Sequence, residues 1–119
     1  MTLFHPMKSE STSNLTEATF FILLSLSPAP KHGYAIMKEV KVLSEERIAL
    51  STGTLYGALK RLLDQGWIVR LDDADPKGNA RDRKVYKLSQ HGRRVLRDEI
   101  ARLNKLLNAA NQRVAKEHT

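Results

Sequence analysis

The most regular pattern of apolar and polar positions lies in the middle of the chain, between Ser51 and Leu63. On a helical wheel of about 100° per residue, the leucines of this segment fall within one quadrant: Leu55, Leu59, Leu62 and Leu63. The opposite side is polar and partly basic, and it carries Lys60 and Arg61. Ser51 stands at the start, where its hydroxyl can accept the amide of Thr54 as an N-cap. The pattern predicts a helix with one buried side and one side open to solvent.

Two strands are predicted to follow this helix. Gln65-Gly66 ends the helix, the apolar segment Trp67–Leu71 comes next, and a second strand covers Arg83–Leu88. A polar loop with proline, glycine and asparagine joins the two strands (residues 72–82). The order helix, strand, loop, strand predicts a winged helix-turn-helix, which is a mainly α (α+β) fold with a two-stranded wing.

Two further helices are predicted upstream. The first covers residues 15–27, with Asn14 as its N-cap, and it is apolar on nearly all sides. A helix of that kind is buried or shared with a partner. The second opens at His32-Gly33, and Tyr34 is predicted to face the core. In the connection that follows, the segment Ile48–Leu50 could form a short strand.

The last predicted helix carries a second apolar pattern. Ser89 is its expected N-cap, and it continues to about Lys116. Apolar positions spaced four and three residues apart form a seam along it: Leu96, Ile100, Leu103, Leu107, Ala110 and Val114. This is the spacing of a helix that packs along another helix. The seam predicts a homodimer; the alternative is that it folds back on its own domain.

These elements divide the chain into three parts. Residues 1–14 are polar and without pattern, and they are expected to form a mobile N-terminal arm. Residues 15–88 form the predicted winged helix-turn-helix domain, and residues 89–116 form a C-terminal dimerisation helix. With 119 residues, of which 41% are hydrophobic and 6% aromatic, the chain suits one small domain with a modest core.

The positive charge is concentrated in one block. Between Lys77 and Lys105 there are ten basic and three acidic residues, and this excess equals the whole formal net charge of +7. The rest of the chain is balanced. Such a block is expected of a protein that binds a polyanion, and the predicted domain would then bind DNA. The alternative is a solvated basic face.

Catalytic and metal-binding chemistry is not indicated by the sequence. The chain has no cysteine, which excludes disulfides and thiolate metal sites. The four histidines show no metal-ligand spacing, and no nucleophile elbow, P-loop or dinucleotide fingerprint is present. We therefore expect no enzymatic activity, no metal and no cofactor. The longest apolar run, Ala18–Leu26, is too short to span a bilayer, so a cytoplasmic protein with no membrane partner is expected.

The sequence resembles the PadR family of transcriptional regulators. The resemblance covers roughly residues 15–107, and its short motifs stand in the order and spacing of that family: His32–Val40, Ser51–Leu63 with Thr54-Leu55-Tyr56, Gly66-Trp67-Ile68, and Arg83–Gly92. The resemblance implies a winged-helix homodimer held by its C-terminal helix. It also implies binding to an inverted-repeat operator, and usually repression that a small molecule relieves. The single C-terminal helix is similar to that of the short subfamily.

The sequence departs from the family pattern in three places. Gly57 stands where many members have proline, which predicts a less rigid first turn of the recognition helix. Asn79–Asp82 replaces a wing tip rich in glycine and arginine, and Asp82 weakens its positive charge. Leu103 falls where some short members carry a tryptophan that stacks on flat drugs. A multidrug-sensing role is therefore not indicated.

The candidate DNA contacts come from the helix at the middle of the chain and from the wing. The full set is Ser51, Thr52, Thr54, Tyr56, Lys60, Arg61, Lys77, Arg81, Arg83 and Lys84. The lysines and arginines can bind phosphates or guanine edges, and Tyr56 can bind a phosphate. Thr54 can contact a thymine methyl group or a phosphate, and Ser51 is expected to act mainly as the cap.

The sequence is compatible with two alternatives and one candidate ligand. The basic block could instead bind an acidic protein partner, which would make the chain a protein-interaction module. A related winged-helix family such as the MarR type is disfavoured by the early recognition helix and the single terminal helix. The inner faces of the first and last helices could line a cavity for a small apolar or aromatic effector, or could fill it: Phe20, Phe21, Leu24, Leu103 and Leu107.

Overall fold

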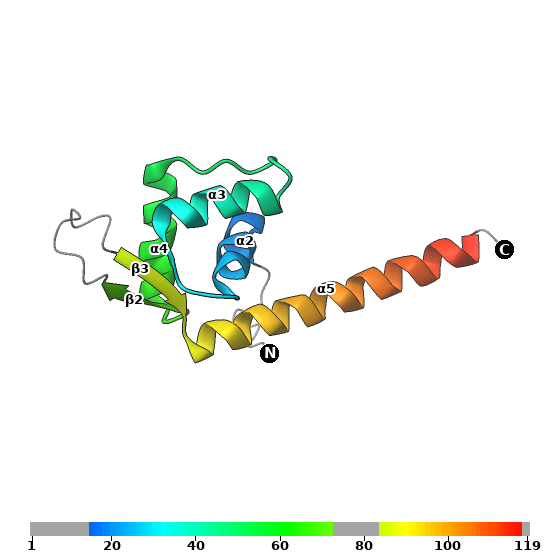
Figure 1. The fold of residues 1–119 in the computed structure, drawn as a ribbon. Coiled ribbons are helices and arrows are strands. Elements are labelled where there is room, and N and C mark those ends of the chain that lie inside the picture. Colours follow the sequence, from blue (N-terminus) through cyan, green and yellow to red (C-terminus); the bar gives the residue numbers. More distant parts are fainter. Residues whose placement is uncertain (1–14, 73–83, 118–119) are drawn as a thin grey trace, which may run out of the picture.

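The structure is a computed structural model that describes residues 15–72 and 84–117. Within these ranges the chain forms four helices and a small three-stranded antiparallel sheet. Figure 1 shows a compact domain from which the last helix projects. The elements in chain order are α2 (Glu17–Leu26), β1 (Lys31–His32), α3 (Gly33–Leu43), α4 (Thr52–Asp64), β2 (Ile68–Asp72), β3 (Lys84–Leu88) and α5 (Gln90–Glu117). This arrangement confirms the expected winged helix-turn-helix of the mainly helical α+β class.

The core is formed by the helices and one face of the sheet. Its buried side chains include Ile22 and Leu23 of α2, Ile36 and Val40 of α3, and Ile68, Tyr86 and Leu88 of the sheet. From α4, Leu55, Leu59 and Leu62 are buried as predicted, whereas Leu63 is only half-buried. The apolar side of α4 therefore faces the domain, and its polar side is left outside.

The sheet contains a strand that the sequence pattern did not indicate. Its order is β1-β3-β2, and β1 pairs with the middle of β3. The short strand expected at Ile48–Leu50 is absent, so that prediction was wrong. The amide of Ile48 donates instead to Ser44 Oγ at 3.0 Å, which leaves it unavailable for a strand ladder. Ile48 and Leu50 pack against the core as part of an irregular connection.

Two other details of the first helices differ from expectation. The N-cap of α2 is Thr16, whose hydroxyl accepts the amide of Thr19 at 3.1 Å, so the helix begins later than predicted from Asn14. Tyr34 is 68% exposed, and its assignment to the core was wrong. In the first turn of α3, Gly33 faces Tyr56 of α4, and Ile36 is the residue that is buried in the core.

The start of α5 is fixed against the end of α4. Ser89 Oγ accepts the amide of Gly92 at 2.9 Å, which confirms the expected cap, and the hydroxyl donates to the carbonyl of Gly66 at 2.6 Å. The amide of Ser89 donates to the carbonyl of Trp67 at 3.1 Å. A Cβ atom on Gly92 would lie 2.8 Å from the carbonyl carbon of Trp67 and nearer still to its oxygen. Only glycine allows this approach of α5 to the domain.

Candidate nucleic-acid interface

The polar side of α4 is open to solvent along its length. Its exposed residues are Ser51, Thr52, Gly53, Thr54, Gly57, Lys60, Arg61 and Asp64. The helix is regular through Gly57. The amide of Thr54 donates to Ser51 Oγ at 3.1 Å, which confirms the predicted cap. α4 thus presents an uncovered helical surface, and the major groove of DNA admits an α-helix.

The two basic residues on this surface are available for binding. Lys60 Nζ lies 3.8 Å from a carboxylate oxygen of Asp64, but both side chains are more than two-thirds exposed. Such a surface pair contributes little to stability, so Lys60 can exchange Asp64 for a phosphate at low cost. Arg61 is exposed and has no carboxylate partner among the described residues.

Tyr56 joins α4 to α3 and is less accessible than the other candidates. It is half-buried, and its ring lies against the backbone of Gly33. A Cβ atom on Gly33 would lie 2.9 Å from Tyr56 Cζ. Part of the role of Tyr56 is therefore to set the distance between the two helices of the helix-turn-helix. Contact of its hydroxyl with DNA stays a prediction.

Of the predicted wing residues, only Lys84 falls in the described part of the chain. Lys77, Arg81 and Arg83 lie outside the described residues, as does the expected N-terminal arm. Lys84 is half-buried at the start of β3, opposite Asp72. Its carbonyl lies 3.2 Å from Nδ1 of His32, which ties the base of the wing to the start of α3.

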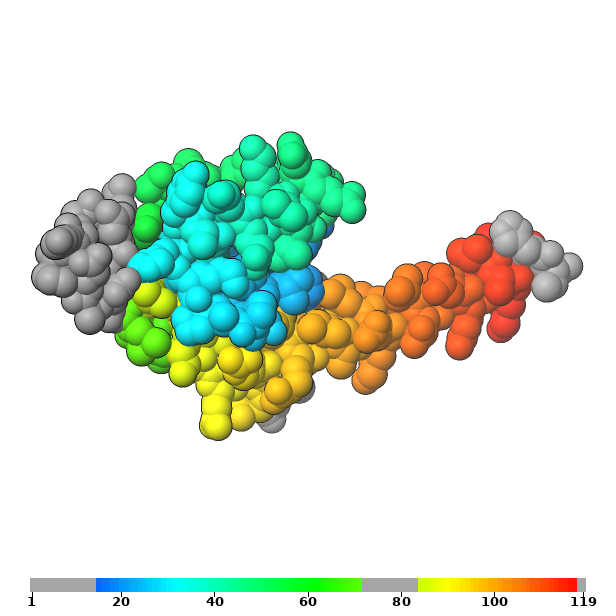
Figure 2. Space-filling model, in the orientation of Figure 1, coloured from blue at the N-terminus to red at the C-terminus, as the bar shows by residue number. Residues whose placement is uncertain are grey.

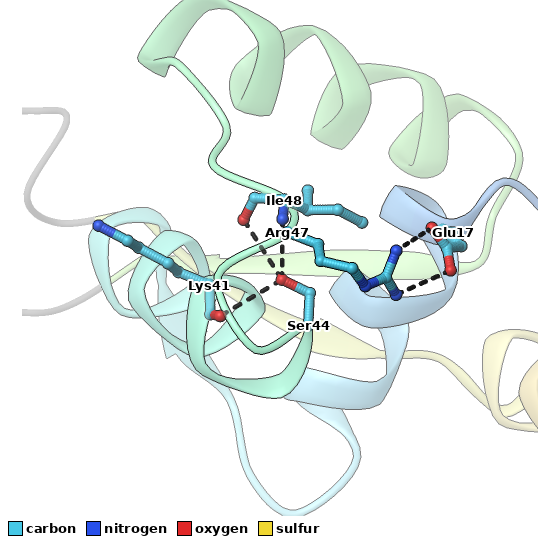
Figure 3. Close-up of polar contacts among 5 residues, drawn as sticks. All are labelled: Glu17, Lys41, Ser44, Arg47 and Ile48. Carbon is cyan, nitrogen blue, oxygen red and sulfur yellow. Dashed lines mark hydrogen bonds and ion pairs between the residues drawn. The ribbon is translucent and has the colours of Figure 1, made fainter.

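The connection between α3 and α4 is held by contacts that sequence reasoning missed. Figure 3 shows Arg47 extended toward Glu17 at the start of α2, with bonds of 2.9 and 3.1 Å to the two carboxylate oxygens. Hydrogen bonds from Arg47, followed by its charge, hold the pKa of Glu17 below its ordinary value. The buried Ser44 accepts the amide of Ile48 and thereby closes the turn. Glu17 and Arg47 are 30 positions apart in the sequence, and a pair at that distance leaves no periodic pattern from which it could be predicted.

The predicted seam on α5 is exposed from Ile100 onward. Ile100 and Leu103 are 38% and 39% exposed, and Leu107 and Val114 are 57% and 48% exposed. Ala110 is also exposed. Leu96 is different because it is 5% exposed and belongs to the core of its own domain. Its assignment to an open intersubunit seam was therefore wrong: the first turns of α5 pack on the domain, and the rest of the helix projects beyond it (Figure 2).

A partly buried ion pair marks the point where α5 leaves the domain. Glu99 is 5% exposed, and its carboxylate accepts two hydrogen bonds from Arg102, at 2.9 and 2.6 Å. The backbone of Leu15 adds a further hydrogen bond. The hydrogen bonds from Arg102 are the main reason why the pKa of Glu99 lies below its ordinary value, although burial acts in the opposite direction. The pair fixes α5 to the start of α2.

A hollow of about 260 Å³ lies at the junction of α2, β3 and α5. It is lined by Leu24, Ser27, Leu88, Arg93, Leu96, Arg97 and Ile100. Nearby on α2, Phe20 and Phe21 are half-buried, and their rings meet edge to face with centroids 5.7 Å apart. Of the expected effector-cavity residues, Leu24 therefore lines a hollow within one chain, whereas Leu103 and Leu107 lie farther along the exposed part of α5.

In the described ranges 15–72 and 84–117, no group of three or more histidine or acidic side chains is placed to hold a metal ion. Within those same ranges, no helix combines the length and hydropathy needed to cross a membrane.

Comparison with known proteins identifies a family. The sequence model of the "Transcriptional regulator PadR-like family" matches residues 22–98. A PadR family transcription regulator from Clostridium difficile R20291 superimposes with a TM-score of 0.68 at 24% identity, over 83% of this chain and 99% of that one. A PadR family transcriptional regulator from Eggerthella lenta has a TM-score of 0.61 at 29% identity, over 82% and 84% of the two chains.

A third similar structure contains nucleic acid. Bacillus subtilis PadR in complex with operator DNA has a TM-score of 0.60 at 24% identity, and the match covers 69% of this chain and 45% of that chain. No curated protein sequence matches this chain.

Proposed function

Because the chain belongs to the PadR-like family of transcriptional regulators, we propose that it is a dimeric repressor that binds an inverted-repeat operator through α4. This is a family of regulators and not of enzymes, in line with the expectation that the chain has no catalytic activity. On this proposal the protein acts where the genome is, so a cytoplasmic location follows.

One observation carries the proposal: α4 buries Leu55, Leu59 and Leu62 and leaves its capped, basic side uncovered. A recognition helix needs this separation, because the residues that hold it in place cannot also contact base edges. Lys60 and Arg61 lie on the uncovered side, where they can donate to guanine edges or to phosphates. Ser51, Thr52 and Thr54 place small donors near the helix start, where the helix dipole favours phosphate. In Bacillus subtilis PadR, a protein of this fold, operator DNA is bound.

The wing supplies the second contact in this proposal. Lys84 begins β3, and Lys77, Arg81 and Arg83 precede it in the sequence, within the block that holds the excess positive charge. Contacts of this type are made with phosphates or in the minor groove, and they add affinity without reading the sequence.

Dimerisation follows from the exposed half of α5. Apolar side chains on a projecting helix are unfavourable in water, and a second copy can bury them. The proposed interface consists of Ile100, Leu103, Leu107, Ala110 and Val114. A two-fold dimer would place two α4 helices in successive major grooves, about 34 Å apart, which is why the operator is expected to be an inverted repeat.

The proposal includes a regulatory ligand. A small apolar or aromatic effector could bind where the α2 and α5 faces of two copies meet, and the hollow that includes Leu24 is one part of that region. Binding there would change the angle between α5 and the winged domain, and with it the spacing of the two α4 helices. A dimer that fills this space with its own side chains would need no effector.

Selection of bound sequences from a random DNA pool tests the function. We expect an inverted repeat whose half-sites are centred about 10 base pairs apart, one turn of B-DNA. The affinity should also fall steeply with salt, by roughly 0.9 in log K per unit of log salt for each phosphate neutralised. No enrichment, together with a stable complex with an acidic protein, would favour the protein-interaction module instead.

A further inference from the structure

The first turn of α3 carries an aromatic side chain that is exposed and lies outside the core cluster of the described residues. Tyr34 is 68% exposed, whereas Tyr86 is 3% exposed and Tyr56 is half-buried. Lys38 lies one turn further along, with its Nζ 5.5 Å from the centroid of the Tyr34 ring. At an exposed site, this cation–π interaction between the ammonium group and the ring is weak. The two side chains therefore present a phenol hydroxyl and an ammonium group together.

This turn is fixed between the two elements that are proposed to bind DNA. Gly33 lies against Tyr56 of α4 on one side. On the other side, β1 leads directly into α3 and pairs with β3, with His32 opposite Val85. Figure 1 shows the start of α3 beside α4, near the end of the sheet where β3 begins. This turn therefore lies between α4 and the start of β3, where a DNA strand that contacts both elements would be close to it.

We propose that Tyr34 and Lys38 bind the phosphate backbone there and join the α4 and wing contacts into one continuous surface. This inference rests on the proposed function. A tyrosine hydroxyl can donate a hydrogen bond to a phosphate oxygen, and Lys38 adds a full charge. Charge complementarity supports the pair, because Lys38 has no carboxylate at ion-pair distance among the described residues. Lys31 nearby is neutralised by Glu39, at 3.5 Å, and is less suited to the role.

Because phosphates carry no sequence information, the pair should raise affinity for any duplex by a similar factor. Removing Lys38 should also reduce the slope of log K against log salt concentration by roughly 0.9. Tyr34→Phe keeps the ring and removes only the hydroxyl, so its expected effect is a loss of about fivefold in affinity, the size of one net hydrogen bond.

The experiment is a fluorescence-anisotropy titration over a range of salt concentrations. It compares the selected operator duplex with an unrelated duplex of the same length, for the wild type, Tyr34→Phe, Lys38→Met and the double variant. Lys41→Met is the matched control, because Lys41 is exposed in the last turn of the same helix, at the end away from α4. We expect weaker binding of both duplexes by the first three variants and wild-type binding by the control.

Three outcomes would overturn the proposal. If Tyr34→Phe and Lys38→Met bind with wild-type affinity and slope, the pair is a solvated surface feature. A loss confined to the operator would place Tyr34 at a base edge and not at a phosphate. An equal loss in Lys41→Met would show that any charge on α3 has the same effect. Failure of the wild type to bind either duplex would instead contradict the proposed function itself, and this proposal with it.

Discussion

The ring of Tyr56 occupies the space in which a side chain at position 33 would have to lie. A Cβ atom on Gly33 would be 2.9 Å from Tyr56 Cζ, which is closer than van der Waals contact allows. The two residues belong to α3 and α4, so this contact sets how closely the helices of the helix-turn-helix approach. The orientation of the proposed recognition helix therefore depends on a glycine in a different helix.

Gly33→Ala should lower the free energy of unfolding by about 1–3 kcal/mol, the usual cost of an overpacked site. Gly53→Ala is the matched control, because nothing lies within 4 Å of a Cβ atom at that exposed position. The control should be neutral, or stabilising by up to about 1 kcal/mol through helix propensity. Chemical denaturation at one fixed protein concentration measures both. Equal effects of the two substitutions would show that Tyr56 can move away at no cost.

The end of α3 offers a stabilising substitution. The amides of Glu45 and Glu46 donate to the carbonyls of Val42 and Lys41, at 3.0 and 2.7 Å, and Glu45 has φ 54°. This is a Schellman motif, which usually has glycine at the left-handed position. α4 ends in the same motif with Gly66 at φ 77°.

Glu45→Gly should therefore raise the free energy of unfolding by about 0.5–1 kcal/mol, since a left-handed conformation is unfavourable for residues that have a Cβ atom. Gly66→Ala is the reciprocal test and should lower it by about 1 kcal/mol. Thermal melts followed by circular dichroism give both values. A destabilised Glu45→Gly variant would mean that the Glu45 side chain has a role beyond the turn.

The pair Glu99–Arg102 predicts a dependence of stability on pH. Hydrogen bonds from Arg102 place the folded-state pKa of Glu99 below its ordinary value. The ionised carboxylate therefore stabilises the fold at every pH above the unfolded-state pKa of about 4.3. This contribution is lost as the pH falls through the lower folded-state pKa.

Glu99→Gln should lower stability at neutral pH by about 1–2 kcal/mol, because the half-buried Arg102 then loses its charged partner. It should also flatten the loss of stability below about pH 4. Glu17→Gln is a suitable comparison, because the Glu17 pair with Arg47 is mostly exposed and should matter less. Denaturation curves between acid and neutral pH test this, and an unchanged acid slope in Glu99→Gln would contradict it.

The proposed dimer interface can be tested with two neighbouring residues. Leu107→Asp puts a charge into the seam, whereas Asn108→Asp makes a similar change on an adjacent exposed position outside it. Sedimentation should find the wild type and Asn108→Asp as dimers and Leu107→Asp as a monomer, because an unpaired charge cannot be buried in an apolar interface. A Leu107→Asp dimer as stable as the wild type would exclude this seam.

Sequence patterns predicted the elements that have a long apolar repeat or a clear cap. The four leucines of α4 and the hydroxyls of Ser51 and Ser89 were sufficient to place two helices. β1 could not be found in this way, because Lys31–His32 is too short to show a period and forms only when β3 is beside it.

The errors in individual residues have a similar origin. Tyr34 fits the apolar spacing of α3, but Gly33 and Ile36 fit it as well. Because Gly33 packs closely on Tyr56, Gly33 and Ile36 face the domain and Tyr34 faces solvent. Leu96 fits the α5 seam, and only the packing of the first turns of α5 on the domain shows that it is core. The helical period alone therefore did not show which of these residues face the core, and the tertiary contacts did.

Operator affinity of a variant that lacks both basic residues of α4 tests the central claim most directly. Lys60 and Arg61 are exposed, so Lys60→Ala with Arg61→Ala should leave the circular dichroism spectrum and the oligomeric state unchanged. The account predicts at least a tenfold loss of affinity for the selected operator, since each good base contact contributes about 1–3 kcal/mol. A double variant that binds the operator as tightly and as selectively as the wild type would show that α4 does not read the DNA.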